Sequence, residues 1–369
     1  MKIDWQNRIF KIVGVMRMRF ASDQEDGLSD AVEQALSHIV QLLGIPSPSG
    51  MTDRAMEYCY HTIAPLGFPL RRTHRGGLIV RVPGKRPDVR VLAAHVDTLG
   101  AVVRRITADG RLKLSAVGGF HFNSVEGEYC KVHTLEGSFY TGTIVPRKGS
   151  RHVYRELEER TEETMEVRLD EVVRGEEDVR RLGIRIGDMV SFESRAVLLP
   201  SGHLKARHLD DKASAGVLIA LLEVMAAERW EPPCSLAILF SGDEEVGYGG
   251  NTALPAESFE YVAVDMGAIG EGLSTTEHVV SICAKDSSGP YHLELRRRLV
   301  YLAERFHVPH ALDVYPYYMS DASAAKQAGY DVATALIGPG IDCSHAQERT
   351  HRDAIASTMR LLALYIQSE

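Results

Sequence analysis

The stretch Val89-Arg90-Val91-Leu92-Ala93-Ala94-His95-Val96-Asp97 decides the fold of this chain. Its first six residues are almost wholly apolar, which predicts a strand that is buried on both faces of a sheet. His95 and Asp97 follow directly where this strand ends. Open α/β sheets bind their ligands just beyond the carboxyl ends of their strands. The stretch therefore predicts both an α/β fold and a functional site at one edge of its sheet.

The same alternation of apolar segments continues along the chain on both sides of this strand. Short apolar runs predict further strands, and apolar residues at helical spacing predict helices. The predicted strands are 78–82, 236–240, 261–264 and 332–337, and the predicted helices are 28–43, 51–65, 213–227 and 355–366. Because strands alternate with helices, we expect a doubly wound α/β layer.

The pattern of apolar and polar residues changes between about residues 100 and 199. Short alternating runs separated by turn signals, such as Ala108-Asp109-Gly110 and Glu136-Gly137, predict an inserted all-β module with one short helix near 176–181. The predicted domain organisation is an N-terminal extension at 1–26, a catalytic α/β domain formed by 27–99 and 200–369, and the insertion at 100–199.

Composition excludes several classes of protein. The 42 Lys and Arg residues against 50 Asp and Glu give a net charge of -8, so no overall basic field favours nucleic acid. No apolar run approaches the ~20 residues of a membrane-spanning helix, so we expect no membrane association. The five cysteines are scattered without CxxC spacing, which is typical of free thiols in a reducing compartment. These features predict a cytoplasmic protein.

Four further sites carry acidic or imidazole side chains at predicted strand ends or at a helix start. They are Glu244 and Glu245 after 236–240, Asp265 at the end of 261–264, His345 after 332–337, and Asp210 before 213–227. Two histidines with several carboxylates are typical of a zinc, cobalt or manganese site. A bridging carboxylate such as Asp210 can span two ions ~3.5 to 4 Å apart. One histidine and one carboxylate then remain for each ion.

Each of these residues also has a simpler interpretation. Asp210 could cap its helix, and Glu244-Glu245 could form a solvated turn before Gly247. We favour the metal site because five sites fall independently at strand ends or a helix start. In the adjacent pair, one glutamate can bind metal while the other acts as the general base toward a metal-activated water. Asp97 would accept the second imidazole N–H of His95 and orient that ring.

In order along the chain, these motifs resemble those of the M42 metallopeptidases, which are cytoplasmic dinuclear-metal aminopeptidases. The resemblance covers roughly residues 28–369. It is carried by Ala94-His95-Val96-Asp97, Leu209-Asp210-Asp211-Lys212, Asp243-Glu244-Glu245-Val246-Gly247, Val264-Asp265 and Ser344-His345-Ala346-Gln347-Glu348. It implies a zinc-exopeptidase-like catalytic domain with a small inserted β-barrel of PDZ-like type, through which relatives dimerise on the way to dodecamers.

The resemblance also implies a role for each site residue and two divalent metal ions per subunit, zinc or cobalt, with manganese as an alternative. The implied roles are one metal held by His95 and Asp265, the other by Glu245 and His345, a bridge from Asp210, a catalytic base at Glu244, and steering of His95 by Asp97. The implied substrates are short peptides that lose their N-terminal residue.

The chain departs from the family pattern at two places. Lys212 stands where the family commonly has Arg, and Asp342-Cys343 stands where it often has an Arg-Tyr pair before the final His. His351 is a spare imidazole, which we interpret as a residue behind the ligands or at a helix start. Ser320-Asp321 resembles a family segment near the substrate pocket.

Three other functions fit parts of the pattern. A two-metal amidohydrolase could act on an N-acylated amino acid or on a specialised, osmoprotectant-related dipeptide, and the altered residues before His345 motivate that alternative. Glycoside hydrolysis by Glu244-Glu245 is disfavoured, because adjacent residues do not readily flank a sugar bond at the required ~5 to 9.5 Å. A non-catalytic scaffold is disfavoured because every expected ligand and the base are present.

Overall fold

The computed structural model describes residues 25–251 and 254–369, so most of the predicted N-terminal extension lies outside the described residues. Its largest sheet has the order β1-β2-β12-β3-β13-β18-β15-β16, with β17 beside β15 and β14 beside β18. These strands are β1 (Leu70–Arg72), β2 (Leu78–Val82), β3 (Val89–His95), β12 (Ser235–Ser241), β13 (Ser258–Val264), β14 (Gly267–Ala268), β15 (Val280–Asp286), β16 (Gly289–Pro290), β17 (His310–Val314) and β18 (Ala333–Ile341).

The four central strands β12, β3, β13 and β18 run parallel to one another. All seven residues of β3 are buried, as its apolar sequence predicts. In the register of β12 and β3, Ser241 lies opposite His95, so both strands end at the same edge of the sheet. The loops that follow these strands therefore leave the sheet side by side.

Helices cover both faces of this sheet. Residues such as Leu92 and Ala94 of β3 pack in the larger apolar core, whereas Val91 and Ala93 pack in a second core on the opposite face. The larger core is built with α2 (Glu25–Leu43), α3 (Asp53–Ile63), α5 (Leu209–Ala227), α6 (Leu293–Arg305) and α8 (Arg352–Gln367), and the second core includes α7 (Asp321–Gln327). The predicted doubly wound α/β layer is confirmed.

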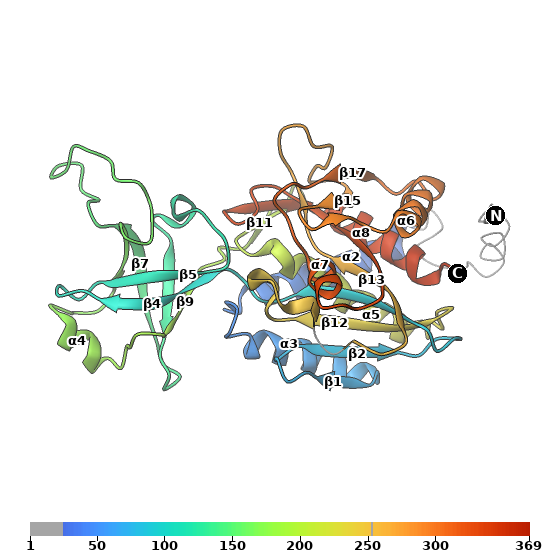
Figure 1. Cartoon of the computed structure of the whole chain (residues 1–369), viewed down its shortest axis with the longest axis horizontal. Coiled ribbons are helices and arrows are strands. Elements are labelled where there is room, and N and C mark those ends of the chain that lie inside the picture. The colour runs from blue at the N-terminus through green and yellow to red at the C-terminus, as the bar shows by residue number, and fades with distance from the viewer. Residues whose placement is uncertain (1–24, 252–253) are drawn as a thin grey trace.

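A closed barrel is inserted between β3 and α5 and lies to one side of the α/β layer (Figure 1). Its strand order is β4-β5-β8-β7-β6-β9, and it has an apolar core of its own. Its elements are β4 (Gly100–Ile106), β5 (Leu112–Val117), the 3-10 turn η3 (Phe122–Val125), β6 (Tyr129–His133), β7 (Phe139–Pro146), β8 (Met165–Leu169), α4 (Glu176–Arg181) and β9 (Met189–Phe192). The predicted insertion of a small barrel is confirmed.

A second sheet of three antiparallel strands joins the return from the barrel to the C-terminal part of the chain. It consists of β10 (Val197–Leu198), β11 (His203–Ala206) and β19 (Glu348–His351). In the described part of the chain, no helix is both long and apolar enough to cross a membrane.

One strand is longer than its sequence predicts. The predicted strand 332–337 continues to Ile341, through two glycines that would ordinarily suggest a turn. A Cβ atom at Gly338 would lie 1.9 Å from the carbonyl oxygen of Asp265, so only glycine fits at this position beside β13. His345 consequently leaves the sheet from a loop beyond Ile341.

Candidate metal centre

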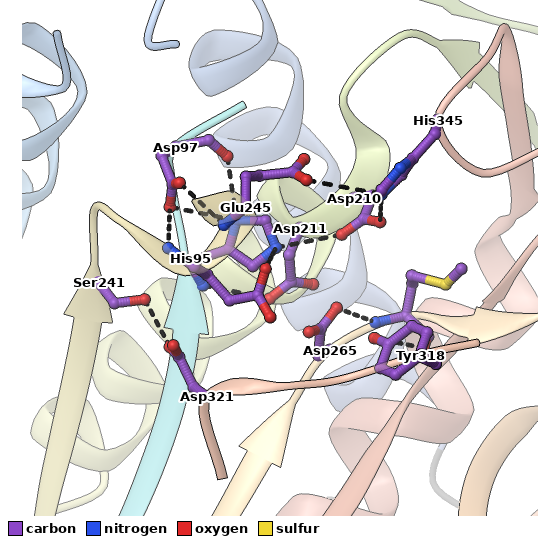
Figure 2. A network of polar contacts seen from close by, with 12 residues as sticks. His95, Asp97, Asp210, Asp211, Ser241, Glu245, Asp265, Tyr318, Asp321 and His345 are labelled. Atoms are coloured by element: carbon purple, nitrogen blue, oxygen red, sulfur yellow. Dashed lines mark hydrogen bonds and ion pairs between the residues drawn. The ribbon is translucent and has the colours of Figure 1, made fainter. Parts of the chain in front are cut away.

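Side chains from five separate segments converge at the carboxyl edge of the large sheet (Figure 2). His95 is the last residue of β3, and Asp265 follows β13 directly. Glu244 and Glu245 begin the 3-10 turn η4 (Glu244–Val246), which follows β12. Asp210 comes from the start of α5, and His345 comes from the loop between β18 and β19. The structure thus brings every predicted site residue into one cluster.

Asp210 lies between the two histidines. Its Oδ1 atom is 3.1 Å from Nε2 of His95, and its Oδ2 atom is 3.3 Å from Nε2 of His345. Asp210 has non-helical backbone angles at the start of α5, which separate it from the regular helix that follows. One carboxylate therefore presents a different oxygen to each imidazole, which is the geometry required of a bridging ligand.

The second nitrogen of each ring fixes where its proton lies. Nδ1 of His95 is 3.0 Å from the carbonyl oxygen of Asp97, and Nδ1 of His345 is 2.5 Å from that of Gly119. A carbonyl can only accept a hydrogen bond, so each neutral ring carries its proton on Nδ1. The unprotonated Nε2 atoms then face the carboxylate of Asp210. Two lone pairs directed at an anion are favourable only with a proton or a metal ion between them, and a metal ion fits this donor set.

Each histidine is also within reach of a second carboxylate. One ligand atom each from His95, Asp210 and Asp265 lie within 4.8 Å of one another. On the other side, Nε2 of His345 is 3.5 Å from Oε2 of Glu245. The residues can therefore be divided into two sets of one histidine and one carboxylate that share Asp210, and nitrogen and oxygen donors of this kind suit zinc or cobalt.

Asp97 contacts more of the site than the sequence indicates. Its Oδ1 atom lies 3.5 Å from Nδ1 of His95, but the shorter contact to this ring comes from its own carbonyl oxygen. The carboxylate instead accepts hydrogen bonds from the backbone N–H groups of Glu244 and Glu245, each at 3.1 Å, and from the hydroxyl of Ser49 at 2.6 Å. Asp97 therefore positions the glutamate pair as well as His95.

Glu244 lies beside the cluster and faces a pocket. Its Oε2 atom is 3.7 Å from Nε2 of His95, and its side chain lines a pocket together with Tyr317, Tyr318 and Met319. Glu244 thus combines proximity to the proposed ligands with access to a bound molecule, which is the placement that a general base requires.

Three carboxyl groups of the site hold their protons unusually strongly, whereas the two histidines hold the pKa of Asp210 below its usual range. Burial raises the pKa of Asp265 to about 7 and that of Glu245 to about 8, and the charge of Asp210 adds to both shifts. Burial also raises the pKa of Glu244 well above its usual range. Burial alone would lower the pKa of His345, but Asp210 and Glu245 outweigh it and raise this pKa to about 10. The cluster is electrostatically incomplete without added positive charge.

Glu348 has a positioning role that the sequence does not predict. Its side chain is buried, and its two oxygens accept the backbone N–H groups of His345 at 3.0 Å and Asp210 at 3.1 Å. It therefore ties together two residues that lie on opposite sides of the cluster. The sequence places Glu348 in the motif that follows His345, but it does not indicate the contact with Asp210, which is 138 residues away.

Two more buried carboxylates adjoin the site. Asp211 accepts the backbone N–H of His95 at 3.2 Å, while its Oδ1 atom has no hydrogen-bond partner among the described residues. Asp321 lines the same pocket as Glu244 and accepts the hydroxyl of Ser241 at 2.5 Å (Figure 2). The structure therefore places Asp321 in the lining of the pocket that Glu244 also lines.

The remaining residues singled out in the sequence lie outside the cluster. Lys212 is buried and donates to the carbonyl oxygens of Leu42 and Ile45 at 2.9 and 2.7 Å. His351 is the N-cap of α8 and accepts the backbone N–H of Asp353, in agreement with its interpretation as a helix start.

Comparison with known proteins identifies related sequences. The sequence profile described as M42 glutamyl aminopeptidase matches residues 76–361. The chain is 50% identical to YhfE of Bacillus subtilis (strain 168), which is provisionally named an aminopeptidase, over 92% of this chain and 99% of that protein.

Solved structures show the same fold. A TET aminopeptidase from the marine sediment archaeon Thaumarchaeota archaeon SCGC AB-539-E09 superposes with a TM-score of 0.82 at 18% identity, covering 91% of this chain and 96% of that one. The TET1 peptidase of Pyrococcus horikoshii, described as assembling into a tetrahedron or a large octahedral shell, superposes with a TM-score of 0.80 at 21% identity, covering 91% and 100%. From the family profile and the extent of its identity to YhfE, this chain belongs to the M42 family of aminopeptidases, which are metal-dependent peptide hydrolases.

Proposed function

We propose that this chain is a two-metal aminopeptidase that removes N-terminal residues from short peptides. Zinc or cobalt would be the metal, with manganese as the alternative. The proposed roles are one ion held by His95 and Asp265, a second held by Glu245 and His345, a bridge from Asp210, a general base at Glu244, and positioning by Asp97. We also propose a division of the chain into three parts: an extension at 1–26, a catalytic domain at 27–99 and 200–369, and an inserted dimerisation domain at 100–199.

The contact geometry of Asp210 is the observation that carries this proposal. Each of its two oxygens contacts a different histidine, and each histidine lies near one further carboxylate. A site for a single ion has no need of this arrangement.

Two bound divalent ions would lower the pKa of a water molecule and stabilise negative charge on the scissile carbonyl oxygen. Glu244 lines the pocket, and its carboxylate would take the proton of the attacking water and deliver it to the leaving amine. Asp97 holds the backbone of Glu244 and Glu245 in place, so the base and its neighbour keep a fixed separation from the cluster. Glu348 performs the same task for Asp210 and His345.

The direct test uses amino-acid p-nitroanilides with purified protein, after chelation and after readdition of zinc, cobalt or manganese. We expect metal-dependent release, and we expect Glu244→Gln to lower kcat by at least ~100-fold while metal binding is retained, because the base is lost and the ligands remain. Unchanged turnover in Glu244→Gln would refute the assigned base. A parallel panel of N-blocked dipeptides separates the amidohydrolase alternative, because an aminopeptidase requires a free amino terminus.

We also propose that the chain is a cytoplasmic homo-oligomer in which dimers assemble into a dodecamer. The barrel carries exposed apolar side chains suited to such contacts, among them Tyr129, Leu135 and Phe139. The closed shells described for the TET1 peptidase support the proposal. Light scattering coupled to size exclusion measures the mass, and a monomer at micromolar concentration would contradict it.

A further inference from the structure

Three imidazoles gather at a second place, where β11, β19 and the first turn of α8 meet. The ring centroids of His351 and His278 are 4.4 Å apart, and those of His351 and His203 are 4.7 Å apart. His351 ends β19, His203 begins β11, and His278 lies just before β15. Asp353 from the first turn of α8 completes the group, which we name the histidine cluster. Neither the resemblance nor the family match gives this cluster a role.

One carboxylate oxygen lies between two of these rings. Oδ2 of Asp353 is 3.0 Å from Nδ1 of His278 and 3.1 Å from Nδ1 of His351. One ligand atom each from His278, His351 and Asp353 lie within 4.8 Å of one another. Zinc binds imidazole nitrogen and carboxylate oxygen at about 2.0 to 2.2 Å, so small side-chain rotations would bring all three atoms onto one ion.

The hydrogen bonds of His351 define which of its ring nitrogens faces Asp353. Its Nε2 atom is 2.9 Å from the carbonyl oxygen of Ser201, which can only accept, so Nε2 carries the proton of the neutral ring. Its Nδ1 atom, with a lone pair and no proton, accepts the backbone N–H of Asp353 and faces the carboxylate of the same residue. A lone pair and a carboxylate oxygen at this separation repel each other unless a proton or a metal ion lies between them.

Within the described residues, no lysine or arginine forms an ion pair with this carboxylate. Glu277, the other acid beside the cluster, is paired with Arg349 through contacts of 2.5 and 2.9 Å. The ion pairs of Asp353, in contrast, are with His278 and His351 only, as far as the structure describes the chain. The arrangement therefore leaves one carboxylate and two imidazole nitrogens for an added cation.

We propose that the histidine cluster is a further divalent-cation site, specific for zinc or cobalt, with His278, His351 and Asp353 as ligands. Two imidazoles with one carboxylate form a borderline donor set that favours these metals over magnesium or calcium. His203 stands next to both rings and is available as a fourth ligand. An ion in this site would replace the hydrogen bond from the Asp353 amide to His351.

The site is joined to the proposed catalytic centre by a single short strand. β19 begins with Glu348, which holds Asp210 and His345, and it ends with His351. At the rise of an extended strand, the two ends are roughly 10 Å apart. An ion bound at the histidine cluster would fix the end of β19 and the start of α8, so occupancy would stabilise the strand that positions the catalytic ligands.

The test measures bound zinc, not activity. The full chain is stripped with a chelator, dialysed against zinc, and its metal content is counted for the wild type and for Asp210→Asn, with and without His278→Gln. We expect His278→Gln to remove one ion per chain from either background. We also expect zinc at about 100-fold above its Kd to raise the Tm of Asp210→Asn by roughly 3 to 6 °C, and to raise that of the double variant much less.

Asp353→Asn provides a second variant, and both side chains are about half exposed, so neither substitution removes packing. His61→Gln is the matched control, because His61 pairs with Glu57 at 3.1 Å on an exposed helix face and Glu57 is also paired with Arg72. Equal zinc content in the wild type, His278→Gln and Asp353→Asn would overturn the proposal. Failure of Asp210→Asn to lose zinc would count against the catalytic centre alone.

Discussion

Glu348→Gln changes a residue that positions two proposed metal ligands, while the ligands and the base keep their own side chains. The Glu348 side chain is buried, and its two oxygens accept the backbone N–H groups of Asp210 and His345. Glutamine has the same shape but only one acceptor oxygen. One of the two backbone N–H groups would therefore face an amide NH₂ group, and either Asp210 or His345 would move away from it.

Two opposing contributions determine how Glu348→Gln changes the free energy of unfolding. A lost hydrogen bond to a neutral carboxyl costs about 0.5 to 1.5 kcal/mol, and a buried donor left without a partner costs about 1 to 3 kcal/mol. Burial raises the pKa of Glu348 to about 8, which shows that the buried charge is itself unfavourable, and glutamine removes it. We expect a net loss of about 1 to 3 kcal/mol in the free energy of unfolding.

The effect on function should be larger than the effect on stability. A misplacement of about 1 Å in a catalytic group can cost ~100-fold in rate, and loss of a group that orients a ligand typically costs 10–100-fold in metal affinity or activity. We therefore expect Glu348→Gln to lower kcat/KM by about 10- to 100-fold and to weaken zinc binding by a similar factor.

The assay combines p-nitroanilide kinetics, zinc titration by calorimetry and urea unfolding. Glu166→Gln is the matched control, because Glu166 is a buried carboxylate in the barrel that pairs with Lys113 at 2.7 Å. Its loss should cost about 3 kcal/mol of stability and leave kcat/KM of the folded protein unchanged. If Glu348→Gln kept kcat/KM and zinc affinity within twofold of the wild type, the positioning role of Glu348 would be refuted.

Three other predictions follow from the same site. The pKa values of Asp265 (about 7) and Glu245 (about 8) exceed the roughly 4 of carboxyls in an unfolded chain. The folded metal-free chain therefore binds more protons than the unfolded chain, and its free energy of unfolding should fall as the pH rises from about 4 to 8. Urea midpoints that rise with pH would contradict this. Gly118→Ala places a Cβ atom 2.5 Å from Leu99 and 3.5 Å from Glu245, so kcat/KM should fall several-fold. Gly127→Ala is the control, because both glycines have a positive φ (+79° and +81°) and a strain of about 1–2 kcal/mol, but no atom lies within 4 Å of the new Cβ at Gly127. Chelation should abolish activity and lower the Tm, and zinc should restore both; chelator-resistant turnover would argue against metal catalysis.

The fold could be predicted largely because its central strands are buried on both faces. The sequence of β3 is almost wholly apolar, so its residues are favoured only in the interior of a sheet. The same holds for Leu236 to Phe240 in β12. The segment from β15 to β17 was not predicted, although Leu295, Leu299 and Leu302 of α6 are spaced as a helical apolar face. The extension of β18 could not be predicted, because it depends on how closely Gly338 approaches the backbone of Asp265.

The candidate site was predictable to the extent that its residues lie at strand ends. His95, Glu245 and Asp265 share an edge because parallel strands bring their carboxyl ends together. The contacts of Glu348 and of the Gly119 carbonyl were not predictable, since their partners are 138 and 226 residues away. Such contacts depend on loop paths, and periodicity contains no information about them.

An anomalous-scattering crystal structure, recorded at the zinc or cobalt edge after metal loading, tests the central claim most directly. We predict two strong peaks about 3.5 to 4 Å apart, on either side of the Asp210 carboxylate, with His95 bound to one and His345 to the other. A single peak, or two peaks without Asp210 between them, would contradict the bridging geometry on which the proposed function depends.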